Sequence, residues 1–174
     1  MALGVCLLFD RASERALRRL WDRLEERGIP TLRSHTHGMH YPHMSYVVLL
    51  RWDLQAVRAA LDTLPDNGPF EVTFDALGSF RRGRACLVPS IPADLVRRQQ
   101  AVVEATRQAG ALVHKHYERD RWLPHAALAP RAQTEYLATV ALAVYEVLPL
   151  TARVKRAALI DSSTGEMWPL PTLP

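Results

Sequence analysis

Two segments of the chain resemble each other at a nearly constant distance, and this internal repeat restricts the possible folds. The run Val5-Cys6-Leu7-Leu8 resembles Ala85-Cys86-Leu87-Val88, and the two cysteines, at 6 and 86, are 80 positions apart. The dipeptides Pro42-His43 and Pro124-His125 match at an offset of 82 positions, from 43 to 125. Several matches in the same order at one spacing indicate a duplicated structural unit.

Hydrophobic periodicity predicts the same order of elements, strand-helix-strand-helix-strand, in each half of the chain. The first half is expected to hold strands at 2–9, 44–50 and 70–77, a helix at 11–27, and a second helix that follows Asp53. The second half is expected to hold strands at 84–89, 125–129, 151–161 and 166–170, and helices from Pro92 to near Gly110 and at 133–147. No linker separates the halves, so we expect them to pack as one body.

Composition is typical of a folded protein with a buried core, at 48% hydrophobic and 23% charged residues. No apolar run approaches the roughly 18–20 residues that cross a bilayer. The apolar N-terminal run meets Asp10 and Arg11 at once, so it predicts a buried strand and not a signal peptide. We therefore expect a cytoplasmic protein without a membrane partner, in which Cys6 and Cys86 are buried thiols.

The net charge of +4 and the pI of about 9.4 are compatible with an anionic partner. The excess of arginine and alanine is equally typical of a GC-rich genome. The cluster of Arg81, Arg82 and Arg84 is more suggestive, because guanidinium groups match the geometry of phosphate. The alternative is a solvated turn. The chain contains no phosphate loop of the G-x-x-x-x-G-K type, so we expect no use of ATP.

His43 and His125 stand at matching strand starts, which a pseudo-two-fold axis would bring face to face. Two imidazoles across a cleft suit the cleavage of a phosphodiester. One must be neutral to take a proton from the nucleophile, and the other must be cationic to give a proton to the leaving oxygen. Both forms are accessible near pH 7, because the ordinary pKa of histidine is about 6.5. The sequence does not say which histidine is the base, and the chemistry requires no cofactor.

The run His43–Tyr46, HMSY, matches the H-x-[S/T]-hydrophobic motif of the two-histidine (2H) phosphoesterase superfamily. The stretch Trp122–Ala129, WLPHAALA, resembles the second motif of that superfamily. Motif spacing and element order resemble the branch of 2′-5′ RNA ligases and RNA 2′,3′-cyclic phosphodiesterases, over essentially the whole chain. The resemblance implies an α+β fold: one bilobal domain over 1–174, with repeat halves of about 1–80 and 81–174. Two antiparallel sheets with outer helices would surround a central groove.

The same resemblance implies that His43 and His125 form the acid–base pair and that Ser45 holds a non-bridging phosphate oxygen. The second motif departs from the family at Ala127, where threonine or serine is expected. The loss of one preorganised donor lowers the rate roughly 10²–10³-fold in well-studied sites. Three readings stay open: Arg131 or a backbone amide compensates, the enzyme is slow or has an altered substrate, or the site binds phosphate without cleaving it.

Other candidates carry weaker signals. Tyr46 is a candidate for stacking on a base at the groove, but packing in a half-buried strand is the favoured reading. Trp122 is predicted to be core or groove wall. The histidines near His43 are candidates for substrate or solvent contacts, and we predict no metal site among them: His35, His37 and His40. His114 and His116 are predicted to lie at the surface.

The resemblance implies a metal-independent phosphodiesterase that hydrolyses 2′,3′-cyclic phosphates of RNA ends or nucleotides, and ligation of 2′-5′ RNA ends would be its reverse reaction. We expect it to act as a monomer. Ala127 motivates the alternative of a non-catalytic or weakened phosphate-binding module. A further alternative is an enzyme for a small metabolite, such as a cyclic phosphate derived from ADP-ribose.

Overall fold

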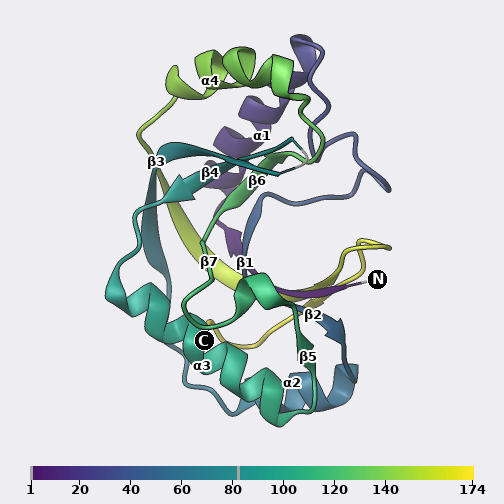
Figure 1. The fold of residues 1–174 in the computed structure, drawn as a ribbon. Helices are drawn as coiled ribbons and strands as arrows, with labels where there is room; N and C mark the ends of the chain where they lie inside the picture. Colours follow the sequence, from purple (N-terminus) through teal and green to yellow (C-terminus); the bar gives the residue numbers. More distant parts are fainter. Residues whose placement is uncertain (1, 82) are drawn as a thin grey trace.

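The elements of the computed structural model, which describes residues 2–81 and 83–174, follow one another twice in the same order (Figure 1). The first series is β1 (Leu3–Phe9), α1 (Arg11–Glu26), β2 (His43–Arg51), α2 (Leu54–Asp62) and β3 (Phe70–Phe80). The second series is β4 (Arg84–Pro89), α3 (Ala93–Gln108), β6 (Ala126–Ala129), α4 (Leu137–Tyr145) and β7 (Leu150–Asp161). The shorter elements are β5 (Leu112–Val113), β8 (Met167–Pro169) and the 3₁₀ helices Lys115–Tyr117 and Thr134–Tyr136. The predicted element order and the α+β class are confirmed.

Local sequence explains where the helices begin and end. The Asp10 side chain accepts a hydrogen bond of 2.8 Å from the backbone N–H of Ser13 and caps α1. Gly28, with φ of +77°, lets the chain leave that helix in the left-handed conformation. The buried stripe of α1 has helical spacing: Leu17, Leu20, Trp21 and Leu24. None of the helices in the described part of the chain combines the length and the apolar character needed to cross a bilayer.

The strands form one antiparallel sheet of eight, in the order β1-β2-β6-β4-β3-β7-β8, with β5 paired to β2. Because β7 also pairs with β1, the path of paired strands closes on itself. The last strand of each half pairs with the first strand of the other half, β3 with β4 and β7 with β1. The sheets expected for the two lobes are therefore joined along β2–β6 and β3–β7.

The helices are exchanged between the halves in the same way. Helix α1 packs against β6 and α3 packs against β2. The pair α1 and α4 covers one end of the molecule and the pair α2 and α3 covers the other (Figure 1). Each lobe thus needs elements from both halves of the chain for its core, so the two halves form one folded body.

The hydrogen-bond registers of the two halves agree residue by residue. Cys6 pairs with Ser45 across β1 and β2, and Cys86 pairs with Ala127 across β4 and β6. Both registers shift just before the cysteine, so that each histidine-bearing strand carries one extra residue. The two lobes therefore present matching backbone positions to each other.

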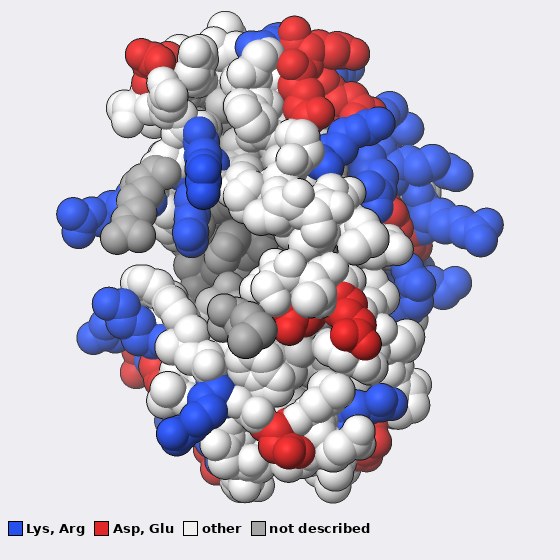
Figure 2. Space-filling view, turned by 90° about the vertical axis from the view of Figure 1, so that its right-hand side faces the viewer, with Lys and Arg blue, Asp and Glu red and all other residues white. Residues whose placement is uncertain are grey.

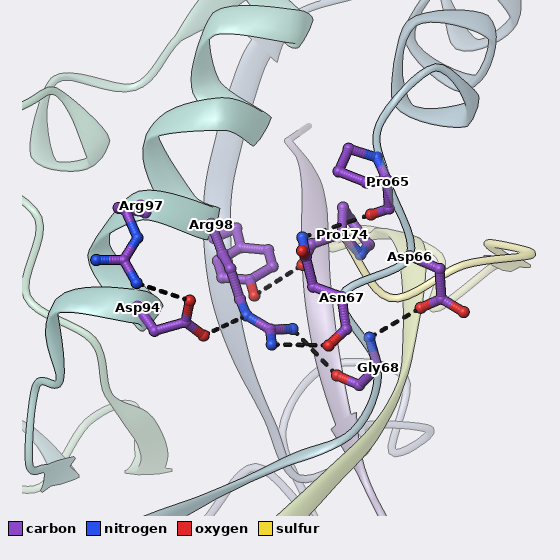
Figure 3. A network of polar contacts seen from close by, with 9 residues as sticks. Pro65, Asp66, Asn67, Gly68, Asp94, Arg97, Arg98 and Pro174 are labelled. Carbon is purple, nitrogen blue, oxygen red and sulfur yellow. Dashed lines mark hydrogen bonds and ion pairs between the residues drawn. The ribbon is translucent and has the colours of Figure 1, made fainter.

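A network around Arg98 joins α3 to the turn before β3 (Figure 3). The Arg98 side chain is only 9% exposed and donates to the carbonyls of Asn67, at 2.9 Å, and Gly68, at 3.0 Å. Its Nε donates to Asp94 at 2.7 Å, and its guanidinium lies 4.7 Å from the centre of the Phe70 ring. With its donors used in this way, Arg98 is a structural residue.

Candidate active site

His43 and His125 are brought together where the lobes meet. His43 is the first residue of β2, and His125 comes directly before β6. The residues that follow them, Met44 and Ala126, are the pair that joins β2 to β6. Both imidazoles therefore leave neighbouring strands at matching points, and both are half-buried.

The two rings are held in the same way by backbone carbonyls. Nδ1 of His43 lies 2.7 Å from the Tyr41 oxygen, and Nδ1 of His125 lies 2.8 Å from the Leu123 oxygen. A carbonyl can only accept, so Nδ1 carries the hydrogen in each ring. This assignment makes Nε2 the nitrogen of each ring that can take or give a proton.

The surroundings separate the pKa values of the two histidines. Burial opposes the cationic form of His43, but the Cys6 sulfur and the Tyr41 carbonyl favour it and raise its pKa to about 9. Burial lowers the pKa of His125, and the charges of His43 and Arg84 lower it further against the effect of the Leu123 carbonyl. At neutral pH, His43 is therefore suited to be the acid and His125 the base.

Ser45 lies on the same side of β2 as His43, because side chains two residues apart share a face. Its hydroxyl oxygen is 3.6 Å from the sulfur of Cys6. Tyr117, in the 3₁₀ helix after β5, reaches the Ser45 hydroxyl, and burial raises the pKa of Tyr117 to about 12. Tyr117 thus remains a protonated donor beside Ser45, and no signal in the local sequence marked it.

Indole groups brace the backbone at both motif positions. Trp122 donates from Nε1 to the Ser45 carbonyl at 3.1 Å, and Trp21 donates to the Ala127 carbonyl at 3.3 Å. Trp122 therefore supports the strand that carries Ser45. The two buried cysteines, Cys6 and Cys86, are free thiols as predicted.

A basic pocket adjoins the second lobe's part of the site. Its volume is about 720 Å³, and its lining consists of Gly83, Arg84 and residues 130–134, among them Arg131. Phe80 links this region to the histidine pair, since its ring meets that of His125 edge-on with centroids 5.0 Å apart. Arg81 is exposed, and Arg82 lies outside the described residues. Figure 2 shows the face that bears the loop before β2, with lysine and arginine side chains at mid-height.

The expectation that Tyr46 stacks on a base is wrong for this structure. Its side chain is 0% exposed, and its hydroxyl donates to the Pro174 carbonyl at 3.0 Å. The register of β1 and β2 passes from Val47 to Ser45 and skips Tyr46, which is the extra residue of the bulge. Tyr46 therefore belongs to the core, the second of the two roles considered for it.

The histidines before β2 pack on one another. The ring centroids of His35 and His40 are 5.9 Å apart, and those of His37 and His40 are 4.2 Å apart. Burial and the neighbouring imidazoles lower the pKa of His40 to about 4. Within residues 2–81 and 83–174, no group of three or more histidine, cysteine or carboxylate side chains has the arrangement of a metal site.

His114 and His116 lie directly after β5, and only His116 has the exposed position that was expected for both. His116 is exposed, and its backbone N–H donates to Nδ1 of His114 at 3.3 Å. His114 is half-buried, and burial together with the charges of His116, Lys115 and Arg84 lowers its pKa. His114 packs against His116 and Tyr117, with ring centroids 5.1 Å and 6.1 Å away.

Known structures share this architecture. Escherichia coli LigT complexed with 3′-AMP superposes with a TM-score of 0.61 at 12% identity, covering 98% of each chain. LigT complexed with NADP⁺ superposes with a TM-score of 0.60 at 13% identity, covering 97% of this chain and 93% of that one. Kluyveromyces marxianus Usb1 with uridine monophosphate superposes with a TM-score of 0.53 at 11% identity, covering 98% of this chain and 97% of that one. None of the curated proteins compared with the chain matches it.

The sequence itself supplies the family. The model of the 2′-5′ RNA ligase superfamily matches residues 10–166, which include both histidine motifs and the strands that carry them. The chain belongs to the 2′-5′ RNA ligase superfamily of 2H phosphoesterases.

Proposed function

We propose that this chain is a metal-independent phosphodiesterase that opens 2′,3′-cyclic phosphates at RNA ends or in nucleotides. The observation that carries the proposal is the histidine pair: each Nδ1 is tied to a carbonyl, so that Nε2 is the nitrogen that exchanges a proton, and the two pKa values are shifted in opposite directions. Because histidines supply both the acid and the base, no step requires a metal or cofactor. The protein acts as a monomer, as one bilobal domain over 1–174 with repeat halves of about 1–80 and 81–174.

In this reaction a water molecule attacks phosphorus and gives its proton to Nε2 of His125. The bond between phosphorus and one ribose oxygen breaks, and Nε2 of His43 gives its proton to that oxygen. The products are a phosphate monoester and a free ribose hydroxyl. Ser45 donates to a non-bridging oxygen, on which charge increases in the transition state. If an RNA hydroxyl replaces the water, the same pair joins 2′-5′ ends.

Two further observations support a nucleotide phosphate as the ligand class. Structures with the same fold hold 3′-AMP, NADP⁺ and uridine monophosphate. In this chain, Arg84 and Arg131 line a pocket between the start of β4 and the loop after β6, and guanidinium groups bind phosphate through paired hydrogen bonds.

The test is turnover in EDTA of two substrates, cyclic adenosine 2′,3′-phosphate and an RNA oligonucleotide with a cyclic phosphate end, with products separated by chromatography. We expect turnover that persists in chelator and is lost in His43→Ala and in His125→Ala. His116→Ala removes an exposed imidazole and serves as the matched control, which should keep the rate. Turnover equal to that of the wild type in both His43→Ala and His125→Ala would refute the roles proposed for these histidines.

The second candidate is a module that binds a nucleotide phosphate without cleaving it, and Ala127 is the observation that favours it. Calorimetry would then record binding of adenosine 3′-phosphate while chromatography records no product from either cyclic substrate. Turnover of the mononucleotide but not of the oligonucleotide would instead favour a small cyclic phosphate as the substrate.

A further inference from the structure

The first strand of the second lobe presents an arginine to the site. Along β4, Arg84 and Cys86 share a face because side chains alternate, and Cys86 pairs with Ala127. Arg84 is also the direct partner of Phe80, whose ring meets that of His125. Strand alternation and the pairing with Phe80 therefore place Arg84, which is exposed, on the face that carries the catalytic histidine.

The equivalent position in the first lobe is Gly4, which also comes two residues before the cysteine. A Cβ atom added at Gly4 would lie 2.8 Å from the Cys6 sulfur and 3.9 Å from the Ser45 hydroxyl oxygen. A side chain at the position of Gly4 would thus point at Ser45, the second residue after His43. The registers of residues 85–87 match those of residues 5–7, and alternation along β4 then gives Arg84 the same relation to Ala127.

The polar side chain comes from a different strand in each lobe. The first lobe combines a residue without a side chain, Gly4, with the hydroxyl of Ser45. The second lobe combines the long guanidinium side chain of Arg84 with Ala127, which has no donor. We propose that Arg84 binds the scissile phosphate in the second lobe, in place of the hydroxyl that Ala127 lacks; this inference rests on the proposed function.

The surroundings of Arg84 suit an anion. In the described part of the chain, neither Arg84 nor Arg131 forms a salt bridge with a carboxylate. The positive charge of Arg84 is one of the causes that lower the pKa of His35, His114 and His125, so it reaches histidines from three segments around the site. A guanidinium can donate two parallel hydrogen bonds to two phosphate oxygens, where a hydroxyl donates one.

The experiment compares the wild type with Arg84→Ala, Arg84→Lys, Ala127→Thr and the double variant Arg84→Ala/Ala127→Thr, using kcat/KM for cyclic adenosine 2′,3′-phosphate. We expect Arg84→Ala to lower kcat/KM roughly 10²–10³-fold, as the loss of one preorganised donor does. Lysine should keep part of the rate, because it retains the charge but not the paired geometry. Threonine at 127 should restore about tenfold or more in the Arg84→Ala background and little in the wild type.

Arg19→Ala is the matched control, because Arg19 is exposed on α1 and its loss makes the same change in net charge. Circular dichroism establishes that each variant is folded. An Arg84→Ala enzyme within about threefold of the wild type overturns the inference and leaves the proposed function intact.

The inference remains testable if the wild type has no turnover, which would refute the proposed function. Calorimetry with adenosine 3′-phosphate then replaces kinetics as the readout. A dissociation constant raised about tenfold or more in Arg84→Ala and unchanged in Arg19→Ala supports an anion-binding Arg84. Equal affinity in the wild type and in Arg84→Ala overturns it.

Discussion

Ser45 in β2 and Ala127 in β6 occupy the same position in the two lobes, each paired with a buried cysteine on the neighbouring strand. An indole N–H braces the carbonyl of each residue. The backbone is therefore equally well supported on both sides of the site, and the difference between the lobes lies in one hydroxyl group. A symmetric scaffold thus holds a chemically asymmetric candidate site.

Removal of the Ser45 hydroxyl should slow the reaction and leave the fold unchanged. We expect Ser45→Ala to lower kcat/KM roughly 10²–10³-fold, because Ser45 aligns a non-bridging oxygen as charge develops on it. Ser79→Ala in β3 is the matched control, since Ser79 is an exposed strand serine. Steady-state kinetics checks the effect, and a Ser45→Ala enzyme as active as Ser79→Ala would show that Ser45 does not touch the phosphate.

The pKa values of His43 and His125 are shifted in opposite directions, which predicts a broad pH profile of kcat/KM. The base must be neutral, so kcat/KM should fall as pH drops through the pKa of His125, which lies below the ordinary value of 6.5. The acid must be protonated, so kcat/KM should fall as pH rises through about 9, the pKa of His43. Initial rates from pH 4.5 to 10.5 check this order. A profile with its alkaline limb near 6.5 would contradict the roles given to the two residues.

The alkaline limb should depend on a buried thiol. The Cys6 sulfur favours the cationic form of His43, so Cys6→Ala should lower the pKa of that histidine and move the alkaline limb to lower pH. NMR titration of the His43 ring follows the same change directly. Cys86→Ala is the matched control: it removes an equally buried thiol, which lies close to the Gly78 carbonyl in the second lobe. Its profile should keep the alkaline limb in place, and a shift of equal size in both variants would assign the effect to packing.

Much of the fold could be predicted from the sequence because its signals are local and occur twice. The capping aspartates, the glycines that end helices and the apolar runs gave the order of the elements, with ends that differ from the structure by a few residues. The joining of the strands into one sheet could not be predicted, because the pairs β2–β6 and β3–β7 depend on contacts between distant segments.

The site was predictable where the repeat marked it and nowhere else. His43, His125, Ser45 and the departure at Ala127 follow from matched positions. Alternation places Tyr46 on the face opposite His43 and Ser45, and the structure confirms packing, the role favoured for it, over stacking on a base. Phe80 and Tyr117 carry no local signature, because the first reaches the site through its pairing with Arg84 and the second through a short 3₁₀ helix. For Arg84 the arginine cluster pointed to phosphate, but only the strand register gave its position.

Gly83 lies at the hairpin that leads into Arg84, and two constraints act on it at once. Its φ of +68° is in the left-handed region, and an added Cβ would overlap the carbonyl oxygen of Ala132 in the loop after β6. Gly110 is the matched position, because its φ is +77° and an added Cβ would meet nothing within 4 Å.

We expect Gly110→Ala to lower the free energy of unfolding by about 1 kcal/mol, the strain of a left-handed alanine. Gly83→Ala should lower it by several times as much, roughly 3 kcal/mol or more, because the loop of residues 130–134 must move to relieve the overlap. That movement would also displace Arg84 and Arg131, so Gly83→Ala should lose activity at temperatures where it is still folded. Urea unfolding and kcat/KM measured on both variants check these outcomes, and equal losses of stability would mean that the close approach of the hairpin to the loop does not hold in solution.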